Sequence, residues 1–240
     1  MRLATCLLET LFVPHCPACE ERAAPPLCAA CAGTLVELGP ACPCCAEPRA
    51  SPGAPDVACA RCRVGDWPLT SLVAPWRYGG ELARAVCALK FAGRPSVARD
   101  LAALVAPFLA AAVRLGELDV IVPVPHHWRR LAARGFNQAE ALARHGRREA
   151  GLATPIARRA LRRVRPTPPQ TGLTAAARAR NLHGAFIVPP RRAGDVRGRR
   201  VLLVDDVVTT GATMAAAGRA LLAGGALEVV GFALARAESS

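Results

Sequence analysis

After about residue 67, short apolar runs typical of strands alternate with longer segments typical of helices. Four short runs predict strands, and they cover residues 69–78, 119–125, 201–204 and 227–237. The run at 201–204 is continuously apolar, which predicts a strand buried on both faces. Helices are predicted between them, at residues 80–93, 96–115, from 138 onward, and 211–223. Strands that alternate with helices predict an α/β fold, with a mostly parallel sheet and helices on both of its faces.

Stop and cap residues place the ends of some of these elements. Pro123 and Pro125 halt the strand at 119–125, and Asn137 with Glu140 has the spacing of an N-terminal cap pair for a helix that starts at Gln138. Ligands bind at the carboxyl ends of the strands in parallel sheets. We therefore expect the chemistry of this region in the loops that follow the second and third strands.

The first 66 residues have a different composition, rich in cysteine, proline and glycine and poor in large apolar side chains. Nine of the eleven cysteines lie here between residues 16 and 62, and eight of them form Cys-x-x-Cys pairs: Cys16 and Cys19, Cys28 and Cys31, Cys42 and Cys45, Cys59 and Cys62. Two such pairs supply the four thiolates of a tetrahedral zinc site. We expect one to two structural zinc ions that provide much of the folding energy of this segment.

The cysteine spacing leaves the pairing open, because the pairs can join sequentially or interleave as a cross-brace. A disulfide scaffold is the alternative to zinc, but the N-terminal segment lacks the features of an export signal, so we expect a cytoplasmic protein. Cys44 is expected to be a spare thiol, and Cys6 and Cys87 to be small buried residues. The change in composition predicts a zinc ribbon module at 1–66 and an α/β domain at 67–240.

The most apolar stretch of the chain, residues 101–113, is expected to be a buried helix. It has thirteen residues and is closed by Arg114, whereas a membrane-spanning helix needs about 20. We therefore expect no membrane insertion.

Charge is unevenly distributed along the chain. The net charge is +13, and residues 126–200 contain 18 arginines but only three acids, Glu140, Glu149 and Asp195. A field of this sign attracts phosphates, on a small substrate or along a nucleic acid, although solvated surface is the alternative for any single arginine. Three groups lie outside the motifs described below: Arg158 and Arg159; Arg162, Arg163 and Arg165; Arg197, Arg199 and Arg200.

The segment VLLVDDVVTTGAT, residues 201–213, joins an apolar strand to two carboxylates and a Thr-Gly turn. Glycine permits close backbone approach, and successive N–H groups at a helix N-terminus form a nest for phosphate oxygens. The hydroxyls of Thr209, Thr210 and Thr213 can add donors. Asp205 and Asp206 suit hydroxyl groups one sugar length away and a divalent cation, so the segment predicts a site for a phosphorylated ribose.

This segment resembles the phosphoribosyl-pyrophosphate (PRPP) signature of type I phosphoribosyltransferases. The resemblance implies that fold, and it implies that Asp205 and Asp206 hold the ribose hydroxyls as the catalytic acids. The full PRPP-binding stretch would be Asp205, Asp206, Val207, Val208, Thr209, Thr210, Gly211, Ala212 and Thr213. A receiver-type acidic pocket or an ordinary strand end is the alternative.

Further blocks narrow the resemblance to the ComF family of competence-associated, phosphoribosyltransferase-like proteins. In chain order the blocks are LKFAGR, VPVPHHWRRLAARGFNQAEALA, QTGLTAAARARNLHGAF and the terminal FALAR, after a multi-CxxC zinc ribbon of the kind common in the family. The resemblance extends from Cys16 to Arg236 and implies a role in competence or DNA uptake, with a protein of the competence machinery as a candidate partner.

In type I enzymes pyrophosphate is held by the loop after a strand that precedes the PRPP signature in the chain; here that strand is the one predicted at 119–125. By position this implicates Pro123, Val124, Pro125 and His126, with Arg129, Arg130 and Arg134 as anion contacts and His127 as a candidate donor. Phe136 is expected to pack in the core. Residues 170–181, with Arg178 and Asn181, lie where related enzymes carry a loop that closes over the substrate.

Two functions remain open on the sequence. The first is transfer of a phosphoribosyl group from PRPP, with Mg²⁺, to an unidentified acceptor. The second is non-catalytic binding of PRPP or a nucleotide, with single-stranded DNA as partner during competence. Six Phe, three Trp and one Tyr give little support for an aromatic platform that stacks single strands.

Overall fold

The computed structural model describes residues 14–24, 26–49, 57–65, 67–91, 95–126, 135–165, 182 and 184–238. Its helices are α2 (Ala29–Ala32), α3 (Ala60–Val64), α4 (Gly80–Phe91), α5 (Pro95–Leu115), α7 (Gln138–Glu149), α9 (Ala212–Ala223) and the 3₁₀ helix η1 (Pro190–Asp195). Its strands are β1 (Ser71–Val73), β2 (Trp76–Arg77), β3 (Val120–Pro123), β4 (Arg162–Arg163), β5 (Phe186–Ile187), β6 (Arg200–Val208) and β7 (Glu228–Arg236).

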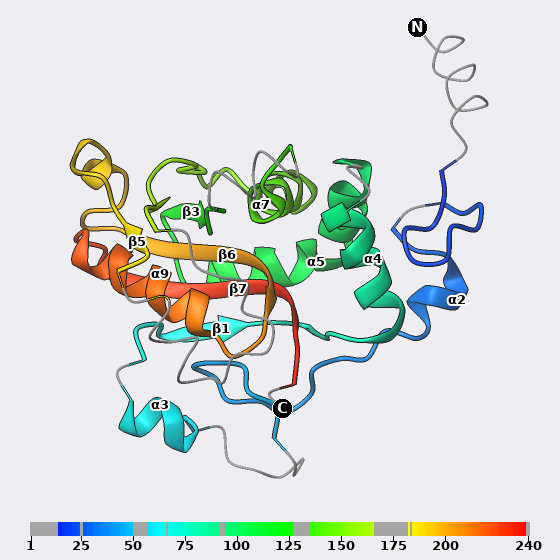
Figure 1. Cartoon of the computed structure of the whole chain (residues 1–240), viewed down its shortest axis with the longest axis horizontal. Coiled ribbons are helices and arrows are strands. Elements are labelled where there is room, and N and C mark those ends of the chain that lie inside the picture. The colour runs from blue at the N-terminus through cyan, green and yellow to red at the C-terminus, as the bar shows by residue number, and fades with distance from the viewer. Residues whose placement is uncertain are drawn as a thin grey trace, which may run out of the picture.

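Five of these strands form one parallel sheet at the centre of the molecule (Figure 1). The order is β1-β7-β6-β3, and β2 pairs with β7 beyond the end of β1. The longest contact is between β6 and β7, where the register runs from Arg200 opposite Glu228 to Val208 opposite Arg236. The prediction of a mostly parallel α/β sheet is therefore confirmed.

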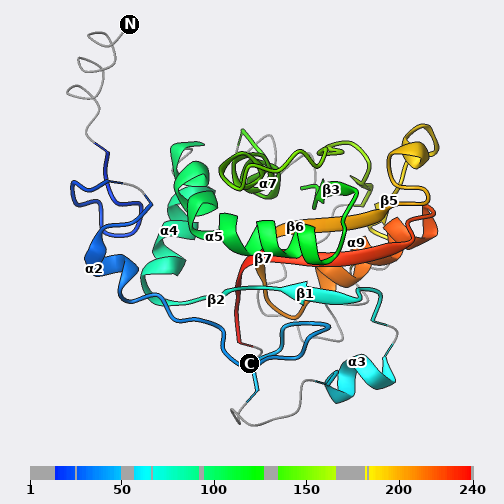
Figure 2. The same cartoon turned by 180° about the vertical axis from the view of Figure 1, so that it is seen from behind.

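The sheet separates two apolar cores. Successive side chains of a strand point to opposite faces, so Leu202 and Val204 of β6 lie in the core formed with α4, α5 and α7, whereas Val201 and Leu203 lie in the core formed with α9. Figure 1 is viewed with α9 in front of the sheet, and Figure 2 shows α5 in front of the opposite face. Both faces are thus covered, as a continuously apolar strand requires.

The helix predicted from Gln138 begins where its cap residue indicates. The Asn137 side chain accepts hydrogen bonds from the N–H groups of Ala139 and Glu140, so α7 starts at Gln138.

Among the described residues, one helix is long and apolar enough to cross a membrane, Ser96–Leu115, but most of that window is buried against the rest of the protein. This burial is the arrangement expected of a core helix.

Several details differ from the sequence predictions. The strand expected at 201–204 continues to Val208, because its pairing with β7 continues through Asp205 and Val207; the two acids lie inside the strand. The strand expected at 69–78 is split into β1 and β2, separated by Ala74 and Pro75. The short antiparallel pair of β4 and β5, and the helices α2, α3 and η1, were not predicted.

The expectation of a buried Cys87 is wrong. Cys87 is exposed on α4, because the helical period turns Leu82, Val86 and Leu89 toward the core instead. Cys6 lies outside the described residues.

The cysteine-rich segment is hydrogen-bonded to the edge of the sheet. Leu38 N–H donates to the carbonyl of Pro75, Arg77 N–H donates to Val36, and Leu72 N–H donates to Pro43. The segment thereby borders β1 and β2. A domain boundary at residues 66 and 67 stays a prediction.

Candidate functional site

The two predicted acids are consecutive residues near the carboxyl end of β6. Both side chains are more than nine-tenths buried. Asp205 Oδ1 accepts a hydrogen bond from the N–H of Asp206 at 2.9 Å, and Asp206 Oδ1 accepts one from the N–H of Val207 at 2.7 Å. Because strand side chains alternate, the two carboxylates face opposite sides of the sheet edge.

Lys90, the only lysine in the chain, is the counter-ion of this pair. Its Nζ lies 3.1 Å from Asp206 Oδ2, and its side chain is 21% exposed. Lys90 comes from the last turn of α4, so the structure joins the LKFAGR block to the acids. The sequence analysis did not place Lys90 in the site. Lys90 lies in the LKFAGR block, which resembles the ComF family, and this position was the one feature of the sequence that could have indicated its role.

Burial and charge act together on Asp205. Burial and the neighbouring charge of Asp206 raise the pKa of Asp205 to about 8, while a backbone hydrogen bond and Lys90 oppose the shift. Without a ligand, this shift favours the protonated form of Asp205 near neutral pH. Groups whose pKa is strongly perturbed by burial and a specific partner are common at functional sites.

The turn from β6 into α9 depends on Gly211. Gly211 is the N-cap of α9 with φ of 78° and ψ of 0°, a left-handed conformation that favours glycine. A Cβ atom at this position would lie only 2.7 Å from the Trp67 ring. The hydroxyl of Thr210 accepts from Ala212 N–H at 3.4 Å, so this N–H points out of the helix start, where a phosphate oxygen could replace the hydroxyl.

The start of the predicted pyrophosphate loop lies beside the segment of β6 that leads into the acids. Val124 N–H donates to the carbonyl of Val204 at 2.8 Å, and the Asn137 side chain donates to the carbonyl of Val124 at 3.0 Å. Pro123 is paired with Val204, and His126 is half-buried two residues beyond Val124. The structure thus brings Pro123, Val124, Pro125 and His126 to the same sheet edge as the acids.

Other predicted residues lie outside the described part of the chain. They are His127, Arg129, Arg130, Arg134 and the 170–181 loop with Arg178 and Asn181. Phe136 is described and packs against the core under α4 and α5, as expected.

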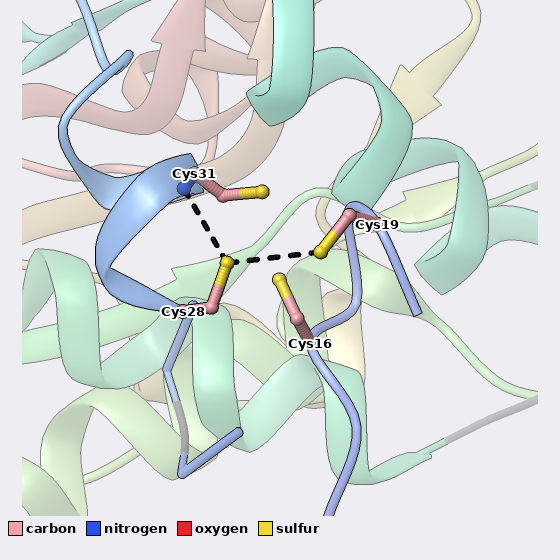
Figure 3. Close-up of side chains that lie close together, drawn as sticks. All are labelled: Cys16, Cys19, Cys28 and Cys31. Atoms are coloured by element: carbon pink, nitrogen blue, oxygen red, sulfur yellow. Dashed lines mark hydrogen bonds between the residues drawn. The ribbon is translucent and has the colours of Figure 1, made fainter. Parts of the chain in front are cut away.

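The eight cysteines of the four pairs form two separate clusters. Cys16, Cys19, Cys28 and Cys31 make the first tetrad, and Cys42, Cys45, Cys59 and Cys62 make the second. The pairs therefore join sequentially, and the cross-brace does not occur. Figure 3 shows the four sulfur atoms of the first tetrad gathered around one point.

The geometry of the tetrads suits structural zinc. All ligand atoms of a tetrad lie within 4.8 Å of one another. The sulfur atoms of Cys19 and Cys28 are 3.7 Å apart, and so are those of Cys45 and Cys59. Zinc–sulfur bonds of about 2.3 Å in a tetrahedron give sulfur–sulfur edges of about 3.8 Å. Four thiols in each tetrad leave no vacant ligand position for catalysis.

The two tetrads repeat the same local structure. In each, the first pair lies in a turn closed by a left-handed residue, Glu20 or Ala46, and the second pair begins at the N-cap of a short helix. In each, burial opposes ionisation of the first thiol, but backbone hydrogen bonds outweigh it and lower the pKa of Cys16 and of Cys42 to about 6. A thiolate is thus ready as the first metal ligand.

The arginine-rich span is divided by the fold. A depression of about 360 Å³ at the amino end of β3 is lined by Arg158, Arg159, Arg192 and Arg199 with a single acid, Asp195. By contrast, Arg163 is buried and its guanidinium lies over the Phe186 ring, 5.5 Å from the centroid. Arg163 therefore packs against the β4–β5 pair. The sequence analysis grouped it with arginines that could contact a phosphate, but its guanidinium is not available to such a partner.

Known proteins resemble the chain in the same regions. A family model described as the phosphoribosyl transferase domain matches residues 153–239, which include β6, the 205–213 loop and α9. The DNA utilization protein YhgH of Salmonella typhimurium is 37% identical over 217 residues, covering 88% of this chain and 90% of that protein. Its counterpart in Escherichia coli K12 is 35% identical over 221 residues, with the same two shares.

A further relative carries a name from competence. Competence protein F of Haemophilus influenzae is 36% identical over 151 residues, covering 62% of this chain and 65% of that protein. The match with YhgH spans most of both chains, and the phosphoribosyl transferase model coincides with the acid pair and its loop. The chain therefore belongs to the ComF family of competence-associated, phosphoribosyltransferase-like proteins.

Proposed function

We propose that the protein binds PRPP and Mg²⁺ at the 205–213 loop and transfers the phosphoribosyl group to an acceptor, with release of pyrophosphate. One observation carries the proposal: two buried carboxylates lie in the same strand-to-helix segment as a left-handed Gly211 turn at the start of α9. Asp205 and Asp206 would accept hydrogen bonds from the ribose hydroxyls. The N–H groups at the start of α9 and the hydroxyls of Thr209, Thr210 and Thr213 would bind the 5′-phosphate.

The residues then have positional roles in the displacement. The acceptor forms a bond to ribose C1, the bond from C1 to the pyrophosphate oxygen breaks, and its electron pair leaves with pyrophosphate. Mg²⁺ bound together with PRPP would supply positive charge to the leaving pyrophosphate. The loop that begins at Pro123 would hold pyrophosphate, and the acids would hold the sugar in place for attack. Lys90 would limit the repulsion between the acids.

Calorimetry with PRPP and MgCl₂ tests the binding step. The variant with both Asp205→Asn and Asp206→Asn should bind more weakly by on the order of 2–5 kcal/mol, as expected for lost hydrogen bonds to charged groups. Asp195→Asn, which removes a surface acid paired with Arg192, is the control and should retain wild-type affinity. Unchanged affinity in the double variant would contradict the assignment.

Pyrophosphate release separates an enzyme from a binding protein. Wild-type protein is incubated with PRPP, MgCl₂ and a panel of nucleobases, and released pyrophosphate is measured against the double variant. Release above the variant's level with one base supports transfer. Tight PRPP binding without release supports the non-catalytic function.

The arginine-lined depression favours a second candidate, in which a nucleic acid binds as well. Its lining contains four arginines and one acid, and within the described part of the chain no carboxylate pairs with Arg159 or Arg199. This surface lies at the amino end of β3, whereas the 205–213 loop lies at the carboxyl end of β6. A phosphate backbone could therefore bind there without competing with PRPP, and a role in competence would supply single-stranded DNA as that partner.

A further inference from the structure

Residues from both Cys-x-x-Cys turns of the second tetrad are connected to the 205–213 loop. Arg61 lies between Cys59 and Cys62, and its Nη1 donates to the carbonyl of Thr210 at 3.0 Å. Cys44 lies between Cys42 and Cys45, and its carbonyl accepts a hydrogen bond from Trp67 Nε1 at 2.9 Å. Each turn thus contributes one contact toward the phosphate-binding segment.

Trp67 connects these contacts to the Gly211 turn. The Arg61 guanidinium lies over the Trp67 ring, 5.5 Å from its centroid, within the range of a cation–π interaction. The far edge of the same ring occupies the space where a Cβ atom of residue 211 would stand. The ring therefore packs directly against the backbone that would bind phosphate.

One buried and one exposed cation share one carboxylate beside this backbone. Glu47, two residues after Cys45, forms an ion pair with Arg236 and lies 3.8 Å from Arg61 Nη2. Arg236 is fully buried at the end of β7, and its Nη1 lies 3.7 Å from the Cβ position of Gly211. Arg236 and Arg61 thus place two guanidinium groups beside the turn, where their positive charge would attract a bound anion.

The metal site decides whether these contacts can exist together. Helix α3 has five residues, too few for a helix to persist alone in water. Fourteen positions separate Cys45 from Cys59, and the shared ion would join the turn that carries Cys44 to the helix that carries Arg61. Loss of the ion would free both from the loop.

We propose that the second tetrad is the positioning element of the phosphate-binding loop: its metal occupancy sets the affinity for the 5′-phosphate through Arg61 and Trp67. The inference rests on the proposed PRPP binding. It adds that the second tetrad, and not the first, positions the phosphate-binding loop. The first tetrad lies instead beside α4, where Cys31 Sγ contacts Glu81 Oε2 at 4.0 Å. Figure 1 shows α2 and α3 at opposite ends of the molecule.

Arg61→Ala in the full chain tests the contact without removing a zinc ligand. PRPP affinity should fall about tenfold, because a hydrogen bond to the loop and a stacked cation are lost together, while zinc content stays at the wild-type value. Arg61→Lys should restore part of the affinity. Arg63→Ala, an exposed arginine on the same helix, is the matched control for the loss of charge and should bind PRPP as the wild type does.

Cys59→Ser and Cys28→Ser compare the two metal sites, because each residue is the N-cap of the short helix in its tetrad. Elemental analysis should show one zinc fewer in each. Amide hydrogen exchange of residues 209–215, measured without ligand, should accelerate in Cys59→Ser and in Arg61→Ala, and much less in Cys28→Ser.

The two readouts separate this inference from the proposed function. Faster loop exchange in Cys59→Ser, in a protein that binds no PRPP, would support the positioning role and overturn the PRPP proposal. Normal PRPP binding and unchanged loop exchange in Arg61→Ala and Cys59→Ser would overturn the positioning role alone. Equal acceleration in Cys28→Ser and Cys59→Ser would also overturn it, because the effect would then be general loss of stability.

Discussion

At the scale of single residues, the acid pair determines how the site responds to pH. Burial and the charge of Asp206 raise the pKa of Asp205 from 3.8 to about 8. Between about pH 4 and 8 the folded protein therefore holds a proton on Asp205 that the unfolded chain has released. Stability falls with rising pH wherever the folded state binds more protons, so this group is destabilising as the pH approaches 8.

Asp205→Asn should remove that dependence. The amide carries no ionisable proton, so we expect a smaller loss of unfolding free energy between pH 5 and pH 8 than in the wild type, and higher stability at pH 8. Urea unfolding of both proteins at pH 5, 6, 7 and 8 gives the difference in unfolding free energy between them at each pH. Groups that titrate alike in both proteins do not contribute to this difference. Asp195→Asn, at the surface, should follow the wild-type profile; a wild-type slope in Asp205→Asn would show that Asp205 titrates normally.

At the scale of elements, single side chains join the start of one element to the end of another. Asn137 caps α7 through its side-chain oxygen and, through its side-chain nitrogen, donates to Val124 beyond β3. The start of the predicted pyrophosphate loop is thereby held at the N-terminus of α7. The sequence predicted the cap from the Asn137 and Glu140 spacing, but the bond to Val124 depends on how β3 and α7 pack.

Asn137→Ala should lower the free energy of unfolding by about 1–2 kcal/mol, the typical effect of losing an N-cap. Asn137→Asp keeps the oxygen that caps the helix but cannot donate to Val124, so it should lose less. Urea unfolding of the three proteins gives the order wild type, Asp, Ala. Equal stability of the wild type and Asn137→Ala would mean that the cap contributes nothing measurable.

At the scale of the whole molecule, positive charge collects away from the proposed PRPP loop. Arg158 pairs with Glu140 and Arg192 lies 3.7 Å from Asp195, which leaves Arg159 and Arg199 as the cations of the depression with no carboxylate partner among the described residues. A surface of this kind would bind a phosphate backbone through charge and would give strongly salt-dependent affinity.

Replacing Arg159 and Arg199 with Ala should flatten the salt dependence of binding to a single-stranded oligonucleotide. Each phosphate contact contributes roughly 0.7 to the slope of log affinity against log salt, so the slope should decrease by up to about 1.4, while PRPP affinity stays near the wild-type value. Fluorescence anisotropy across a salt series measures it. Arg84→Ala with Arg114→Ala removes the same charge elsewhere; an equal effect from this control would indicate general attraction only.

Local sequence patterns determined the parts of this protein that depend on neighbouring residues. Continuous apolar runs predicted the buried strands, Cys-x-x-Cys spacing predicted the metal-binding pairs, and the segment at 201–213 predicted adjacent acids before a glycine turn. Each depends on spacing within a few residues, where backbone geometry leaves few alternatives. The family resemblance carried the assignment further, to a fold that the sheet order bears out.

Only the tertiary structure decided which distant segments meet. Sequential pairing of the cysteines, Lys90 beside Asp206, and Arg61 on the carbonyl of Thr210 join positions far apart in the chain. The same holds for Arg163. A count of charges along the chain assigns it to the surface, but in the structure its guanidinium packs over the Phe186 ring. Composition cannot reveal such contacts, because they depend on how the sheet brings its loops to one edge and which arginine stems it covers.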